Sequence, residues 1–225
     1  LSDGKYHLLD PTWVPFIREL WSSAEQQQNF LRGLPEGSDL DITPISPPEN
    51  HYIHIFGTSA ITPEGTLEGE LTIRAEGQSD GGIRRMFTGN YKDQWQHNAE
   101  MELKRVNPAA EMLSVDYGDP YDYQSGPIKI VLKYRIPFYA IVNGDEMIMK
   151  SFIASGFLRR SIGNLMMDTH AETKVYPFRD RCSRQVQLTE SITLPGKYQI
   201  IYRPEAETFS DTTASFEGSY EMSLD

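Results

Sequence analysis

Alternation of apolar and polar residues is the clearest pattern in the second half of the chain. Residues 128–136 place an apolar side chain at every other position, directly after Gly126-Pro127. Alternation with a period of two is typical of a strand with one buried face. Similar patterns between turn signals predict further strands at 51–56, 69–75, 147–157, 186–194, 198–202 and 214–224. The sequence therefore predicts a mainly β fold in which hairpins join antiparallel strands.

A different spacing is found between residues 82 and 106. Apolar residues recur there at every fourth position, at Ile83, Phe87, Tyr91, Trp95, Ala99 and Leu103. This spacing predicts one long helix over about 82–106 that ends at Asn107, because a residue that precedes proline disfavours helical geometry. Together with the strands, it predicts an antiparallel β-sandwich with one packed α-helix.

The first fifty residues differ from the rest in composition. Residues 5–9 are predicted to form a short strand, and the spacing of apolar residues within 15–32 predicts a partly helical segment. Residues 34–50 contain four prolines, which lack the N–H group that helices and sheets need. We therefore expect a strand, helix and proline-rich extension at 1–48, followed by a β-sandwich domain at 49–225.

Charge and cysteine content narrow the function classes. The 225 residues include 32 acidic and 21 basic side chains, for a net charge of −11. A surface that follows phosphate groups needs clustered Lys and Arg, so we expect no nucleic-acid partner. The single cysteine excludes an internal disulfide, and no apolar run approaches the roughly 18 residues that span a bilayer.

A loop rich in tyrosine and aspartate is the first candidate binding site. Tyr117, Tyr121 and Tyr123 offer rings on which a sugar or a peptide could stack. The same loop contains three aspartates that supply either calcium ligands or a solvated acidic turn, at positions 116, 119 and 122. Their spacing lacks the ligand pattern of an EF-hand, so we expect no metal site and no cofactor.

Cys182 and two histidines are the remaining candidates for chemistry. Arg179, Arg181 and Arg184 surround Cys182 in sequence and favour its thiolate, but no His lies close by in sequence. Cys182 is thus either a nucleophile or a half-buried structural residue. His51 and His54 lie three apart on a predicted strand, which directs them to opposite faces and disfavours a shared metal.

The most specific motif is at the start of the chain. It reads Asp3-Gly4-Lys5-Tyr6-His7-Leu8-Leu9-Asp10-Pro11-Thr12-Trp13. It resembles the strand that ends in Leu-Asp-Pro-Thr in bacterial transglutaminase-like, papain-related proteins. The resemblance implies that Asp10 is the third member of a Cys-His-Asp triad, which orients the catalytic histidine. Looser matches in the remaining chain resemble the β-rich C-terminal domain of that family, whose function is unknown.

This resemblance implies a non-catalytic role for the chain. The cysteine and histidine of the family lie upstream of Asp10, and the chain begins at Leu1 without them. We therefore expect an accessory piece of a longer cysteine peptidase or amide-bond transferase, with the upstream catalytic domain as its partner. The resemblance also implies a bacterial periplasm or cell envelope location. The alternative is a free-standing glycan- or peptide-binding module that uses the three tyrosines.

Overall fold

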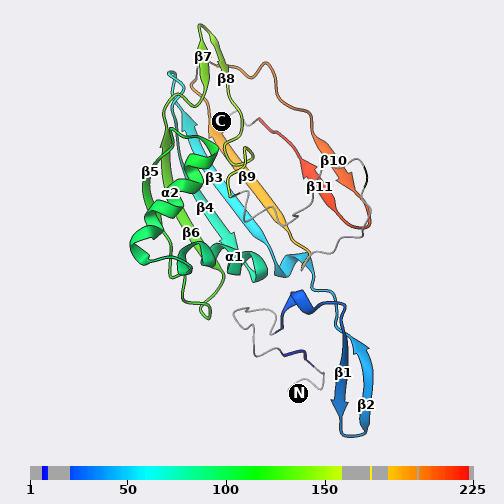
Figure 1. Cartoon of the computed structure of the whole chain (residues 1–225). Coiled ribbons are helices and arrows are strands. Elements are labelled where there is room, and N and C mark those ends of the chain that lie inside the picture. The colour runs from blue at the N-terminus through cyan, green and yellow to red at the C-terminus, as the bar shows by residue number, and fades with distance from the viewer. Residues whose placement is uncertain (1–6, 10–20, 159–172, 174–181, 197, 223–225) are drawn as a thin grey trace.

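The computed structural model describes residues 7–9, 21–158, 173, 182–196 and 198–222. Its main element is a five-stranded sheet with the strand order β5-β6-β4-β3-β9 (Figure 1). These strands are β3 (Ile53–Ile61), β4 (Leu67–Ala75), β5 (Glu111–Asp116), β6 (Ile128–Ile136) and β9 (Val186–Thr193). Neighbours are antiparallel, except that β9 runs parallel to β3. Strands hold more of the chain than helices do, which confirms the mainly β prediction.

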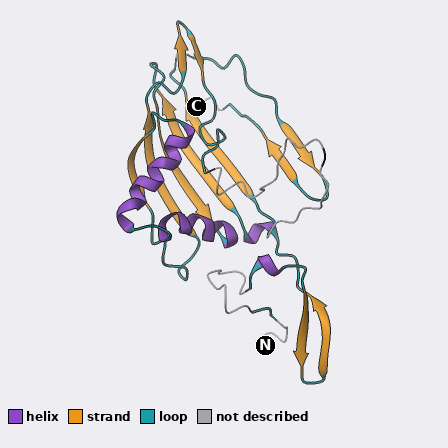
Figure 2. Cartoon of the chain, in the orientation of Figure 1, coloured by secondary structure: helices purple, strands orange, loops and turns teal. Residues whose placement is uncertain are grey.

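A helical layer covers one face of this sheet (Figure 2). It consists of α1 (Gly77–Thr88) and α2 (Trp95–Val106), which connect β4 to β5. Because β6 lies between β4 and β5 and is antiparallel to both, this is a split β-α-β arrangement. Residues 149–158 complete the layer, and four of them belong to the same core: Phe152, Ile153, Phe157 and Leu158.

The two faces of the sheet follow from the alternation in the sequence. In β6, the side chains of Ile128, Ile130 and Leu132 are buried beneath the helices, whereas those of Lys129 and Lys133 are exposed on the opposite face. Full burial of one such aliphatic side chain contributes about 1.5–3 kcal/mol to stability. We call the solvent-facing surface of these five strands the open face.

The single helix predicted over about 82–106 is wrong, because two helices occupy this range. Gly89 ends α1, and the side chain of Asn90 donates a hydrogen bond to the Met86 carbonyl. A four-residue repeat advances by about 40° per step relative to a helix with 3.6 residues per turn, so one straight helix cannot keep all the apolar residues on one face. The break resolves this conflict and leaves Tyr91 82% exposed.

The extension is partly a hairpin. β1 (Asn29–Leu34) pairs with β2 (Gly37–Ile42), so the helix predicted within 15–32 and the linker predicted at 34–50 are both corrected there. Pro35 and Glu36 form the turn, in which proline fits because no ladder hydrogen bond is needed. Residues 10–20 lie outside the described residues. The domain boundary near residue 48 stays a prediction.

Two more hairpins and three short helices complete the described structure. One hairpin pairs β7 (Ile141–Asn143) with β8 (Glu146–Ile148), and the other pairs β10 (Glu207–Ser210) with β11 (Ser215–Gly218). The 3-10 helices are Ser23–Glu25, Pro48–Asn50 and Lys92–Gln94. Of the strand predicted at 147–157, only residues 147 and 148 are in a strand, and the strand predicted at 198–202 is not formed. None of the described helices has the length and apolar character needed to cross a bilayer.

Candidate functional site

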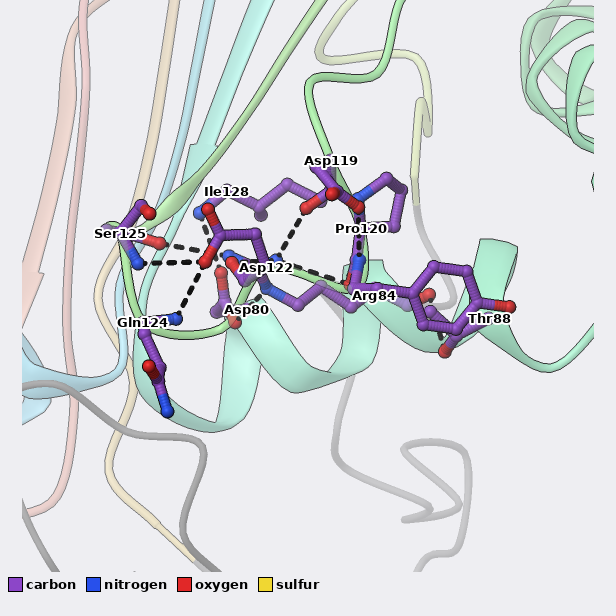
Figure 3. Close-up of polar contacts among 11 residues, drawn as sticks. Asp80, Arg84, Thr88, Asp119, Pro120, Asp122, Gln124, Ser125 and Ile128 are labelled. Atoms are coloured by element: carbon purple, nitrogen blue, oxygen red, sulfur yellow. Dashed lines mark hydrogen bonds and ion pairs between the residues drawn. The ribbon is translucent and has the colours of Figure 1, made fainter.

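Two charged residues are buried where α1 meets the loop that follows β5. Asp80 and Arg84 lie one helical turn apart, and the exposed fraction of Arg84 is only 2%. The Arg84 Nε donates to Asp80 Oδ2 over 2.7 Å, and Asp80 Oδ1 accepts the Ile128 N–H, also over 2.7 Å (Figure 3). The pair therefore connects α1 to the first residue of β6.

The remaining donors of Arg84 hold the loop of residues 117–127, which we call the tyrosine loop. Its Nη1 donates to the carbonyl oxygens of Asp119, Pro120 and Asp122 over 3.0, 3.3 and 2.8 Å (Figure 3). Its Nη2 donates to the Gly126 carbonyl over 2.9 Å. A planar guanidinium with five donors suits such a set of carbonyls, whereas a lysine ammonium does not. One buried side chain thus fixes the path of the whole loop.

Burial of Asp80 and Arg84 removes their charges from water, and hydrogen bonds compensate part of that cost. Burial raises the pKa of Asp80, and the hydrogen bonds from Arg84 and from the Ile128 N–H oppose that rise. Removal of one partner from a buried ion pair leaves an uncompensated charge, which costs several times more than loss of a surface pair. The loop conformation and the helix position are therefore coupled.

The three aspartates of the loop region form local turns. Asp116, Asp119 and Asp122 each accept the backbone N–H two residues further on, over 2.9, 2.9 and 3.1 Å. The Asp122 carboxylate also accepts from Ser125, and these hydrogen bonds lower its pKa. Such side-chain turns are a common local use of aspartate. Across the part of the chain that the structure describes, no three acidic, His or Cys side chains gather as metal ligands.

The three predicted tyrosines have different environments. Tyr117 is half-buried, with its ring centroid 5.1 Å from that of Phe87, and burial raises its pKa. The Tyr123 ring lies 4.8 Å beneath the Arg84 guanidinium carbon, in a cation–π contact. Tyr121 alone is well exposed, at 59%, with its ring 5.8 Å from Trp95. The tyrosine loop therefore presents one aromatic side chain to solvent instead of a three-ring platform.

Ser46 and His51 form a buried pair that the sequence interpretation missed. The Ser46 Oγ lies 2.7 Å from His51 Nε2, while His51 Nδ1 accepts the Gln78 N–H over 3.1 Å. Because Nδ1 acts as an acceptor, the neutral imidazole carries its proton on Nε2 and donates it to the serine. This tautomer cannot deprotonate Ser46. Gly77, with φ of 61°, allows the close approach, because a Cβ there would overlap His51 Nδ1.

The other histidine of the predicted pair is separated from this one. His54 lies on the open face of β3, where its ring stacks on Tyr52 at 4.3 Å and its Nε2 contacts Gln185 Oε1 at 3.3 Å. His51 is buried before the strand begins. The two imidazoles thus occupy different environments, but His51 precedes β3, so the strand predicted to begin at residue 51 begins at Ile53 instead.

Glu190 is a half-buried carboxylate that the sequence did not reveal. Its Oε2 accepts from Ser151 Oγ over 2.6 Å and from the Ile153 N–H over 3.3 Å, which ties residues 151–158 to β9. Burial raises the pKa of Glu190. Burial together with the nearby Glu190 charge raises the pKa of Tyr139 to about 12. Glu190 therefore connects residues 151–158 to the edge strand β9 through hydrogen bonds.

The remaining candidates are distributed as follows. Asp10 lies outside the described residues, and Cys182 is buried, with an exposed fraction of 3%.

Comparison with protein-family models, with curated proteins and with solved structures found no match to this chain. The i,i+4 spacing of Asp80 and Arg84 is the one sequence signal for the site. The carbonyl partners of Arg84 lie 35 to 42 residues further along and carry no such signal.

Proposed function

We propose that this chain is a non-catalytic accessory portion of a transglutaminase-like cysteine peptidase or amide-bond transferase, and that it acts by binding. The motif around Asp10 supports the family, and the same resemblance supports a bacterial periplasm or cell envelope location. In this proposal, residues 1–48 end the catalytic domain and link it to the accessory domain. The partner is the upstream catalytic domain of the same polypeptide.

The observation that carries this proposal is the exposed apolar face of the β1-β2 hairpin. Leu31 and Leu40 are directly opposite each other and are 67% and 71% exposed, and Ile42 is 61% exposed on the same face. An isolated two-stranded hairpin is marginally stable in water and needs a packing surface. The hairpin lies within residues 1–48, which in this proposal end the catalytic domain and link it to the accessory domain. That domain is therefore the surface on which we propose it packs.

The direct test of the non-catalytic assignment is the reactivity of Cys182 in this chain. We expect slow alkylation by iodoacetamide from about pH 5 to about pH 9, because the side chain is buried. Alkylation of the urea-unfolded chain is the control for reagent quality. Fast alkylation that persists to about pH 6 would indicate a stabilised thiolate and would overturn the non-catalytic assignment.

The docking part of the proposal needs a polypeptide that includes the upstream domain. We expect the amide hydrogens of β1 and β2 to exchange more slowly in that polypeptide than in this chain. Replacement of Leu31 and Leu40 by serine should remove the difference, whereas Tyr91→Ser, at an exposed site far along the chain, should leave it unchanged. Equal exchange in both polypeptides would contradict docking at this hairpin.

A free-standing glycan- or peptide-binding module is the second candidate. It is favoured by the rigid tyrosine loop, since a ring on a fixed backbone loses little entropy when a ligand stacks on it. Tyr121→Ala should then abolish retention on arrays of glycans or peptides, while Tyr91→Ala serves as the matched exposed control. Tyr117 and Tyr123 are unsuitable for this test because they support the loop from inside. Retention that is unchanged in Tyr121→Ala would eliminate this candidate.

A further inference from the structure

The β10-β11 hairpin, which we call the arm, carries an exposed aromatic pair. Phe209 and Phe216 are directly opposite in the hairpin register and are 57% and 58% exposed. The strands have only four residues each, which is too short for independent stability without a packing surface. The arm is a separate two-stranded sheet, drawn in orange and red in Figure 1. Its aromatic pair is therefore largely open to solvent.

The turn of the arm is locally well defined. Asp211 Oδ1 accepts the N–H groups of Thr213 and Ala214 over 2.7 and 2.8 Å, and hydrogen bonds to Thr213 and Ala214 lower the pKa of Asp211. Since side chains two apart share one face of a strand, Glu207 points to the same side as Phe209. One face of the arm thus combines an aromatic pair with a carboxylate two residues away.

The arm is also strongly acidic. Between residues 203 and 222 the one basic residue is Arg203, whose guanidinium donates to the Tyr220 carbonyl over 2.7 Å. The acidic residues of this stretch are Glu205, Glu207, Asp211, Glu217 and Glu221. A surface that receives the arm must therefore offer positive charge next to an apolar strip.

The open face of the sheet has such a surface at one end. Lys129 of β6 is directly opposite Arg74 of β4, and Arg74 is directly opposite His54 of β3. We call these three residues the cationic row, in which Lys129 and Arg74 carry the positive charge. Like charges directly opposite each other destabilise a sheet. Among the described residues, neither Lys129 nor Arg74 has an ion-pair partner.

The other end of the same face is arranged differently. There Lys133 pairs with Glu70 at 3.6 Å, and Arg135 pairs with Glu68 at 3.1 Å. Both are cross-strand pairs of opposite sign, in the same two strands that carry the cationic row. The uncompensated positive charge is therefore confined to one end of the face, where it attracts anionic groups from outside the sheet.

An apolar row lies directly beside the cationic row. Val131, Thr72 and Phe56 are aligned across β6, β4 and β3, two residues further along each strand, and Phe56 is 38% exposed. Two residues along a strand span about 6.6–7 Å. Glu207 and Phe209 have the same two-residue spacing on the arm. The carboxylate and the aromatic ring of the arm therefore have the same spacing as the cationic row and the apolar row of the open face, and each matches its row in chemical character.

We propose that the arm of one copy docks on the open face of a second copy. Phe209 and Phe216 cover the apolar row, and Glu207 approaches Arg74 and Lys129. The contact joins two different surfaces, so it closes into a reciprocal pair or continues as a chain of subunits. The association is weak because the arm buries little surface. It is salt-dependent because the contact of Glu207 with Arg74 and Lys129 is electrostatic. This proposal goes beyond the accessory role and does not depend on it.

Sedimentation velocity of the whole chain tests the proposal over a range of protein concentrations. We expect reversible self-association that weakens at least about tenfold in Kd between about 50 mM and about 500 mM NaCl. The double variant Phe209→Ser with Phe216→Ser should remain monomeric at concentrations where the parent chain associates. Tyr91→Ser, which removes an 82% exposed ring from the helical side, should associate like the parent chain.

A charge exchange tests the predicted pairing. Glu207→Lys and Arg74→Glu should each weaken association about tenfold, and the combination should restore it, because the opposite charges then meet again. Arg85→Glu, an exposed charge change on α1, is the control. The proposal is overturned if the parent chain is monomeric at every concentration, if association persists in the double serine variant, or if the combined exchange fails to restore it.

Discussion

The helix-covered sheet and the arm are built from the same kind of strand but differ in what their side chains contact. In β6, alternate side chains are buried under α1, α2 and residues 149–158. In β10 and β11, every residue except Gly218 is exposed, including the opposed pair Phe209 and Phe216. Register and turn chemistry are thus sufficient to specify a hairpin. They do not provide the burial that stabilises it.

The same comparison applies to polar groups. In the helix-covered sheet and the segments packed on it, which we call the body, some polar side chains are buried. Arg84, Asp80 and His51 form hydrogen bonds with backbone groups far away in sequence. In the arm, the polar contacts are local, within the turn that Asp211 forms. Long-range buried bonds are expensive to break, whereas exposed local bonds contribute little. We therefore expect mutations in the two regions to differ strongly in their effect on the free energy of unfolding.

The largest effect is expected at Arg84. Arg84→Ala leaves Asp80 as an unpaired buried charge and removes four hydrogen bonds to loop carbonyls, so we expect a loss of about 3–5 kcal/mol in unfolding free energy. Urea denaturation measures this. Arg85→Ala, at the exposed neighbouring position, is the matched control and should stay within about 0.5 kcal/mol. A loss below about 1 kcal/mol for Arg84→Ala would refute its role as the anchor.

The next comparison uses one phenylalanine from each region. Phe87 is 1% exposed and packs against Trp95 and Tyr117, so Phe87→Ala should cost about 3–5 kcal/mol. Phe209→Ala should cost less than about 0.5 kcal/mol, because its ring is exposed. Urea denaturation measures both losses in unfolding free energy, and the protein is kept dilute so that self-association does not contribute. Similar losses at the two positions would break the distinction between body and arm.

A smaller, pH-dependent effect is expected at Glu190. Its pKa is raised in the folded chain, so ionisation is less favourable there than in the unfolded chain. The folded state therefore loses stability as pH rises from the ordinary carboxyl pKa of about 4.3 through the raised value. Glu190→Gln removes this loss, so the variant should gain stability relative to the parent chain as pH rises above about 4.

Urea denaturation of both proteins at a series of pH values measures that difference. The pKa of Asp80 is also raised, but Asp80 is present in both proteins and cancels in the comparison. Ser151→Ala, which removes a hydrogen-bond donor to Glu190, should steepen the dependence. A difference between the parent chain and Glu190→Gln that does not change with pH would show that Glu190 titrates as an ordinary exposed carboxyl.

The parts of the fold that could be predicted from the sequence are the strands whose apolar and polar side chains alternate. β3, β4, β6 and β9 were expected from alternation, and the structure has them within a few residues of the predicted limits. The β1-β2 hairpin was not expected, because the prolines of residues 34–50 pointed to a linker. Leu34 to Gly37 contains a proline at a turn position, which is compatible with a hairpin as well.

The candidate site was only partly predictable for a physical reason. Tyr117, Tyr121 and Tyr123 were singled out as aromatic side chains, but their environments depend on Arg84 and Trp95 from distant helices. Arg84 in turn binds backbone carbonyls, which every residue possesses and no sequence pattern marks. The helix break at Gly89 follows from the mismatch between a four-residue repeat and the helical period, and this mismatch is visible in the sequence.

Amide hydrogen exchange of the dilute, monomeric chain tests the difference between the two regions most directly. We expect the amides of β3, β4 and β6 to exchange only through global unfolding, and those of β10 and β11 to exchange through local opening at far lower cost. At high protein concentration and low salt, the arm should gain protection. Arm amides as strongly protected as those of β4 in the monomer would contradict the account, because the arm would then be stabilised within its own chain.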